Sequence, residues 1–398
     1  MRLALRRGLA ALALAGAVAA FAQDTLRPEV ATPARAAVEA LKAGRFAEAL
    51  SLVAEAERVP NRTPYENFVL DQLRGGAAAG AGDTATAVKS YEAVLAANRL
   101  SPAEALPVME GLVGTSARGK DWERVVTWGR RYLEGGGTSP QVRRMLVNGL
   151  YQRSDFAEAA RQVTLLIEAD EKAGRRPGED LLRLLASSQL KQHSDAGYDA
   201  ALERLLRWHP KADYWRDRLS RLQRQAGFDE QYLVDIYRLL AAAGALQEAQ
   251  DYSVAADLAL RATLPTEAKK LLDAASAAGK LAPEAEAMKA RATRESAADE
   301  KDLLAATPPP ASGNALVANG IAHAVAGRTD RGIALVEQGL AKGNVTKPDA
   351  ARLRLGWILA AAGRSEPARA VFKDLLDKPG GAGDLARLWL IHLDKPAS

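Results

Sequence analysis

The 398-residue sequence contains no cysteine, which excludes a disulfide framework and any metal site built from thiolate ligands. Histidine is almost as scarce, and none of the four histidines belongs to a metal-binding motif such as two histidines four residues apart. The sequence also lacks a G-x-S-x-G nucleophile elbow. We therefore expect no metal, no cofactor and no enzymatic activity. The histidines are His193, His209, His323 and His392.

Aromatic residues are few, at 5% of the chain, and β-branched runs are nearly absent. No stretch of four to eight residues alternates between apolar and polar side chains as a half-buried strand does. Alanine and leucine dominate instead, and their spacing is helical. The composition therefore predicts an all-α chain.

Long apolar runs are missing after the first 22 residues. Within the first 22 residues, three arginines precede an apolar stretch from Gly8 to Phe21, and Ala20-Phe21-Ala22 matches a small-x-small cleavage pattern. The apolar stretch is shorter than the roughly 20 residues that span a bilayer. We predict a signal peptide over residues 1–22, cut after Ala22, with no integral membrane segment afterwards. The Ala- and Arg-rich composition is bacterial in style, so we expect a periplasmic protein.

A strong excess of one charge is also lacking. The formal net charge is +5, and removing the three arginines of the predicted signal peptide leaves 51 basic residues against 49 acidic ones, a net charge of +2. This near-balance gives no electrostatic reason to expect nucleic acid as a partner.

A helix-turn-helix pattern recurs along the rest of the chain. In AGRFAEALSLVAEA (Ala43–Ala56) and RSDFAEAARQVTLLI (Arg153–Ile167), a turn residue is followed by an aromatic residue and then by apolar residues at i, i+3, i+4 and i+7. Such spacing predicts an amphipathic helix after each turn. Similar turns are predicted near Gly44, Gly82, Lys120, Ser154, Ala196, Gly227, Thr263, Ser296, Gly327 and Gly363.

This pattern resembles the tetratricopeptide repeat (TPR), a helix-turn-helix unit of about 34 residues. The small and aromatic positions that carry the resemblance are Gly44, Phe46 and Ala49 in the first unit, and Asp155, Phe156 and Ala159 in the fourth. Several repeats are longer than the standard period, and the proline that closes the family's second helix is mostly missing. The resemblance implies an all-α solenoid of about ten helix-turn-helix repeats, with a C-terminal capping helix around Asp384–His392.

The repeats are interrupted at TPPPASG (Thr307–Gly313), whose three prolines cannot continue a helix. We predict a solenoid over residues 23–306, a Pro-rich joint over 307–313, and further repeats with the cap over 314–398. A long loop between repeats is an equally good interpretation of the joint, and the segment from 296 to 313 is either a repeat or a linker.

The stretch GTSARGKD (Gly114–Asp121) begins like a phosphate-binding loop, G-x-x-x-x-G-K. That loop needs Ser or Thr after the lysine, whereas Asp121 stands here, and it needs a preceding strand, whereas residues 102–113 have helical spacing. Lys120 also falls where the other repeats have their turn. We interpret the stretch as a repeat turn.

One helix face is a candidate binding site. The first helix of each repeat lines the concave groove in this family, and Gln141, Arg144, Asn148 and Tyr151 share one face of such a helix. Arg144 and Asn148 resemble part of the carboxylate clamp by which some TPR domains grip a peptide C-terminus. The alternative is an ordinary solvated helix face.

The leading hypothesis is a non-catalytic periplasmic scaffold that binds proteins through its groove. The middle of the chain, from YWRDRLSRL (Tyr214–Leu222) to LPTEAKKLLDAASAAGKL (Leu264–Leu281), resembles periplasmic TPR proteins found alongside the TonB–ExbB–ExbD system, which implies a partner from that complex. The alternative is a carbohydrate-binding factor, or one for assembly or export of envelope polymers. It would use exposed aromatic residues, for which the candidates are Trp122, Trp128, Trp208, Trp215, Trp357 and Trp389; for Trp215, packing in the core is the favoured interpretation.

Overall fold

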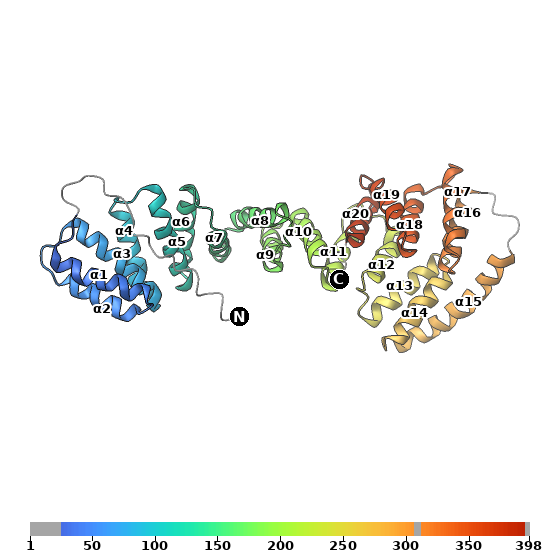
Figure 1. The fold of residues 1–398 in the computed structure, drawn as a ribbon. Coiled ribbons are helices and arrows are strands. Elements are labelled where there is room, and N and C mark those ends of the chain that lie inside the picture. The colour runs from blue at the N-terminus through green and yellow to red at the C-terminus, as the bar shows by residue number, and fades with distance from the viewer. Residues whose placement is uncertain (1–24, 306–311, 395–398) are drawn as a thin grey trace. The chain divides into compact units, whose positions relative to one another are not determined.

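The computed structural model describes residues 25–305 and 312–394, and in these ranges every regular element is a helix. Helices that follow one another in sequence pack against each other, as Figure 1 shows. The prediction of an all-α chain is confirmed. The predicted signal peptide and the cleavage site after Ala22 lie outside the described residues, as do residues 307–311 of the predicted joint.

The chain divides into two compact units, the first ending at Asp195 and the second beginning at Ala196. Helices on both sides of the predicted Pro-rich joint belong to the second unit. The helices of unit 1 are α1 (Pro28–Lys42), α2 (Phe46–Glu57), α3 (Pro64–Ala81), α4 (Thr84–Ala96), α5 (Pro102–Arg118), α6 (Trp122–Glu134), α7 (Pro140–Gln152), α8 (Phe156–Lys172) and α9 (Glu179–Lys191).

Unit 2 starts within α10 (Asp195–Trp208) and contains two short 3₁₀ turns, η1 (Glu230–Tyr232) and η2 (Pro283–Ala285). Its other helices are α11 (Ala212–Leu222), α12 (Leu233–Ala242), α13 (Ala249–Arg261), α14 (Pro265–Ala277), α15 (Glu286–Ala305), α16 (Gly313–Val325), α17 (Thr329–Ala341), α18 (Pro348–Ala361), α19 (Ser365–Lys373) and α20 (Ala382–Leu393).

The turns inside the helix pairs share one backbone conformation. In the first, Gly44 has φ of 71° and donates its N–H to the carbonyl of Leu41, while Arg45 N–H bonds the carbonyl of Ala40 at 2.8 Å. This left-handed residue ends the helix and satisfies its last carbonyl groups. Eight of the ten predicted turns have a positive-φ residue at the predicted position, and a ninth has one at His193 instead of Ala196. The eight are Gly44, Gly82, Lys120, Ser154, Gly227, Thr263, Gly327 and Gly363.

The tenth predicted turn, at Ser296, is wrong. Ser296 is buried in the middle of the continuous helix α15, and its hydroxyl lies 2.9 Å from that of Thr266. The surrounding residues are strong helix formers without glycine or proline, so nothing breaks the helix there. The predicted count of about ten repeats is therefore not confirmed.

Aspartate caps the second helix of several pairs in unit 1. The Asp83, Asp121 and Asp155 side chains each accept a hydrogen bond from a backbone N–H in the first turn of α4, α6 and α8. Asp121 is thus a helix cap, and the preceding Lys120 has φ of 56°. The stretch GTSARGKD is the end of one helix, a left-handed turn and the start of the next, as predicted.

Two helices of unit 2 touch through their backbones. α16 and α17 lie side by side in Figure 1, with glycines at their contact. A Cβ atom added to Gly332 would lie 2.6 Å from the carbonyl oxygen of Gly320, and one added to Gly339 would lie 2.7 Å from that of Gly313. Only glycine permits this approach.

The core of unit 2 joins residues far apart in sequence. Trp215 and Leu219 of α11 share one buried cluster with Leu385 and Trp389 of α20. Arg218 bridges Glu203 at 3.0 Å and Asp384 at 3.2 Å, and the N–H of Asp229 bonds the carbonyl of Gly380. Helix α20, which was predicted as a C-terminal capping helix, packs its apolar face into this core.

Within the part of the chain that the structure describes, no helix combines the length and the apolarity needed to cross a bilayer.

Candidate functional site

The four residues predicted as a binding face lie on α7 in unit 1. Gln141, Arg144 and Asn148 are exposed, and Tyr151 is half-buried. Ser139 begins the helix by accepting the N–H of Val142, and Pro140 occupies its first turn, where a missing N–H costs nothing. The buried stripe of α7, which includes Leu146, fixes these polar residues on the other side of the helix.

Two of the four contact the next first helix of the solenoid, α9. Arg144 Nη1 pairs with Asp180 Oδ2 at 3.1 Å, with 44% and 73% of the two side chains exposed. The hydroxyl of Tyr151 lies 2.6 Å from that of Ser187, and its ring meets Phe156 edge-on. An ion pair this exposed is weak, so an anion on a ligand can compete with Asp180 for Arg144.

The other two residues are less engaged. Gln141 accepts a hydrogen bond from the Ser139 hydroxyl at 3.2 Å, and that hydroxyl also contacts Glu110 of α5. The side chain of Asn148 makes no hydrogen bond with residues that the structure describes. The face therefore presents one free amide and one weakly paired guanidinium, four residues apart.

None of the six tryptophans is an exposed side chain. Trp215 and Trp389 are 1% and 2% exposed, which confirms the expectation of core packing for Trp215. The other four are half-buried. Trp128 carries Arg131 on its ring and donates to Glu92, and Trp357 lies under Arg238.

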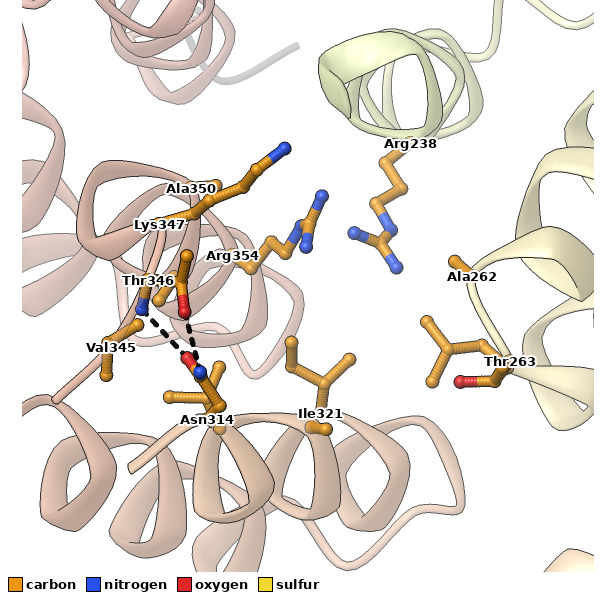
Figure 2. Close-up of a pocket in the computed structure, with 14 residues that line it drawn as sticks. Arg238, Ala262, Thr263, Asn314, Ile321, Val345, Thr346, Lys347, Ala350 and Arg354 are labelled. Atoms are coloured by element: carbon orange, nitrogen blue, oxygen red, sulfur yellow. Dashed lines mark hydrogen bonds between the residues drawn. The ribbon is translucent and has the colours of Figure 1, made fainter. Parts of the chain in front are cut away.

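Unit 2 contains a pocket of about 340 Å³ that the sequence did not suggest (Figure 2). Its lining comes from four places that are far apart in sequence: one residue of α12, the turn between α13 and α14, one side of α16, and the loop before α18 with that helix's first two turns. The lining residues are Arg238, Ala262–Leu264, Asn314, Val317, Ala318, Ile321, Val345–Lys347, Ala350, Ala351 and Arg354.

The two arginines of the pocket share a carboxylate. Arg238 bonds both oxygens of Glu267, at 2.8 and 2.7 Å, and reaches Asp235 at 2.7 Å. Arg354 lies 3.3 Å from the same Asp235 and donates to the carbonyl of Gln231. Figure 2 shows both guanidinium groups at one end of the pocket. This network ties α12 to α14 and α18.

Burial and pairing act in opposite directions on Arg238, which is 6% exposed. Burial alone would lower the pKa of its guanidinium, but the charge of Glu267 and the hydrogen bonds to Glu267 and Asp235 raise that pKa above its usual value. Trp357 covers one face of the group, with 4.0 Å between Arg238 Cζ and the ring centroid. Arg238 is therefore a permanent, fixed cation.

The opposite wall of the pocket is fixed by an amide. Asn314 Nδ2 donates to Thr346 Oγ1 at 2.7 Å, and Thr346 N–H donates to Asn314 Oδ1 at 2.9 Å (Figure 2). This pair holds the loop before α18 against the start of α16. Lys347 follows in that loop and is exposed, and it forms no ion pair with the described residues. The loop thereby places one unpaired ammonium group beside the pocket.

In the described ranges, no three His, Cys, Asp or Glu side chains are grouped closely enough to hold a metal ion. The pocket combines cations and hydrogen-bond donors with an aliphatic wall, as ligand-binding pockets commonly do. Sequence reasoning missed it because Arg238 and Arg354 lie on helices more than a hundred residues apart.

The fold defines an all-α protein built from sequentially packed helix pairs, the architecture of helical-repeat proteins. Comparison with protein-family models gives no match for this chain, and comparison with curated proteins gives none either.

Proposed function

We propose that this chain is a non-catalytic tetratricopeptide scaffold of the bacterial periplasm that binds a protein or peptide partner on the first helices of unit 1. The observation that carries the proposal is the polar face of α7, where Arg144 and Asn148 stand four residues apart and are available to a ligand. Exposed polar side chains on a rigid helical array are a common basis for peptide recognition.

The arrangement of the first helices supports the same surface. Glu110 of α5 reaches Ser139 at the start of α7, and Arg144 of α7 reaches Asp180 of α9. Polar contacts thus run from one first helix to the next on one side of unit 1. A partner lying across these helices would meet rigid, neighbouring polar groups rather than mobile loops.

The candidate partner is an envelope complex such as TonB–ExbB–ExbD, which rests on the resemblance of residues 214–281 to proteins found beside that system. The carbohydrate alternative called for exposed aromatic residues. Since none of the six tryptophans is exposed, we retain protein binding as the proposal.

The test is a binding titration of the purified chain against the periplasmic domains of TonB and ExbD. We expect the double variant Arg144→Glu, Asn148→Ala to weaken binding by at least about tenfold, because loss of a charge-assisted hydrogen bond costs about 1.5–3 kcal/mol. Arg153→Glu is the matched control. It makes the same charge change nine residues further along, which is half a turn away on an ideal helix.

Binding that both variants leave unchanged would keep the scaffold and reject the α7 face. If the chain binds neither the TonB domain nor the ExbD domain, the candidate partner is rejected. A capture of envelope proteins on the immobilised chain then decides whether the scaffold itself stands, since retention of no protein would overturn it.

A further inference from the structure

We propose that the pocket of unit 2 is a binding site for a small aliphatic carboxylate. The proposal concerns a site in a different unit from the α7 face and does not depend on that face, so it goes beyond the proposed function. Its basis is a cavity that places unused cationic donors at one end and an aliphatic wall beside them (Figure 2).

The cationic end retains donors that the protein does not use. Arg354 commits its Nε and Nη2 atoms to Asp235 and Gln231, whereas its Nη1 atom makes no hydrogen bond with the described residues. Lys347 adds an unpaired ammonium group. A carboxylate can accept from a guanidinium nitrogen and an ammonium group at once, and such charge-assisted bonds are the strong ones.

The net charge favours an anion. Asp235 and Glu267 offset the two guanidinium groups, so Lys347 leaves one positive charge in excess. No carboxylate is among the lining residues. Asp349, two residues after Lys347, forms an ion pair with Arg352 at 3.1 Å. An anionic ligand would therefore complete the charge balance of this cluster without meeting an acidic group on the pocket wall.

The start of α18 adds to this preference. The loop residue at its N-cap, Lys347, gives no side-chain hydrogen bond to the helix, and Ala350 and Ala351 of the first turn line the pocket. An uncapped helix start carries a partial positive charge and free N–H groups. It supports the site but does not define it, since the two cationic side chains do so.

The rest of the lining sets the size and the character of the ligand. Val317 and Ile321 of α16 with Leu264 and the alanines of α18 form an aliphatic wall. A volume of about 340 Å³ lies at the lower end of the range found for small-molecule sites. The ligand is therefore a small carboxylate with an aliphatic body.

Two sources supply this chemistry: a free medium-chain carboxylate, and the C-terminal residue of a peptide ending in an apolar side chain. Octanoate represents the first source and N-acetyl-leucine the second. N-acetyl-leucinamide is the matched probe that lacks the charge. We expect calorimetric titration of the full chain to detect at least one of the two carboxylates, and to detect the amide at least about tenfold more weakly.

Lys347→Ala tests the site with little risk to folding, because Lys347 is exposed and unpaired. We expect it to weaken carboxylate binding several-fold, and Arg354→Gln to weaken it further. Lys373→Ala makes the same charge change on α19, away from the pocket, and should have no effect. A thermal unfolding curve for each variant shows whether it is folded.

The proposal is overturned if neither carboxylate binds below about 10 mM, a free energy weaker than about −3 kcal/mol. It is also overturned if the amide binds as well as the acid, or if folded Lys347→Ala and Arg354→Gln bind as the parent does. Binding of octanoate alone identifies a free carboxylate, and binding of N-acetyl-leucine alone identifies a chain terminus.

Discussion

The buried network around Arg238 allows a quantitative prediction. In Arg238→Met, Asp235 retains Arg354, but Glu267 loses the only ion-pair partner it has among the described residues, while its side chain is 11% exposed. Removing one partner of a buried pair costs about 3–5 kcal/mol, because an uncompensated charge remains. For a unit of about 200 residues, each kcal/mol lowers the midpoint by about 2–4 °C, so we expect a fall of about 6–20 °C.

The double variant Arg238→Met, Glu267→Leu separates the lost attraction from the stranded charge. Because hydrophobic residues can replace a buried ion pair at little cost, the double variant should recover at least half of the loss. The assay is thermal and urea unfolding, monitored by tryptophan fluorescence. The signal includes Trp357, whose ring lies under the Arg238 guanidinium group. A midpoint shift under about 2 °C for Arg238→Met, or no recovery in the double variant, would refute this reasoning.

Two further predictions concern Glu66 and the glycine contact. Hydrogen bonding to Arg27 is the main reason that the pKa of Glu66 falls from its usual 4.5 to about 2. Glu66 therefore stabilises the fold above pH 4.5, and this contribution is lost as the pH falls toward 2. Denaturant titrations of Glu66→Gln should show a variant that is less stable at pH 7 and approaches the parent near pH 2; a constant difference would contradict this. Gly332→Ala should cost about 1–3 kcal/mol, because its Cβ would meet the Gly320 carbonyl. Gly76→Ala, in open space within α3, should instead gain up to about 1 kcal/mol in the same unfolding assay, and equal effects would contradict the contact argument.

Local sequence signals carried most of the fold. A turn residue and the apolar stripe of the helix after it lie within about fifteen residues of sequence. Whether the turn forms, as it does at Gly44 and Ser154, depends on the backbone conformation of those few residues. The turn predicted at Ser296 was wrong because a serine among strong helix formers does not end a helix. A useful signal was overlooked: Pro64, Pro102 and Pro140 each mark the first turn of a first helix.

In the candidate sites, too, local features could be predicted from the sequence and long-range contacts could not. That Arg144 and Asn148 share an exposed face follows from helical spacing alone. The pairing of Arg144 with Asp180 does not, because Asp180 lies one repeat later and its register depends on how the repeats stack. The pocket of unit 2 was beyond sequence reasoning altogether, since it forms where α12 and α18 meet and no local pattern encodes that meeting.

The long-range closure of unit 2 has a consequence for how the chain becomes native. In unit 1, helices next to each other in sequence are joined by bonds such as that between Arg27 and Glu66, 39 positions apart. Such an array can assemble pair by pair as it leaves the ribosome. In unit 2, Arg218 bonds Asp384, which lies 166 residues later and is synthesised near the end of the chain. The surface of α11 therefore stays uncovered until synthesis is almost finished, and this late-closing half is where we expect slow folding and the greatest dependence on chaperones.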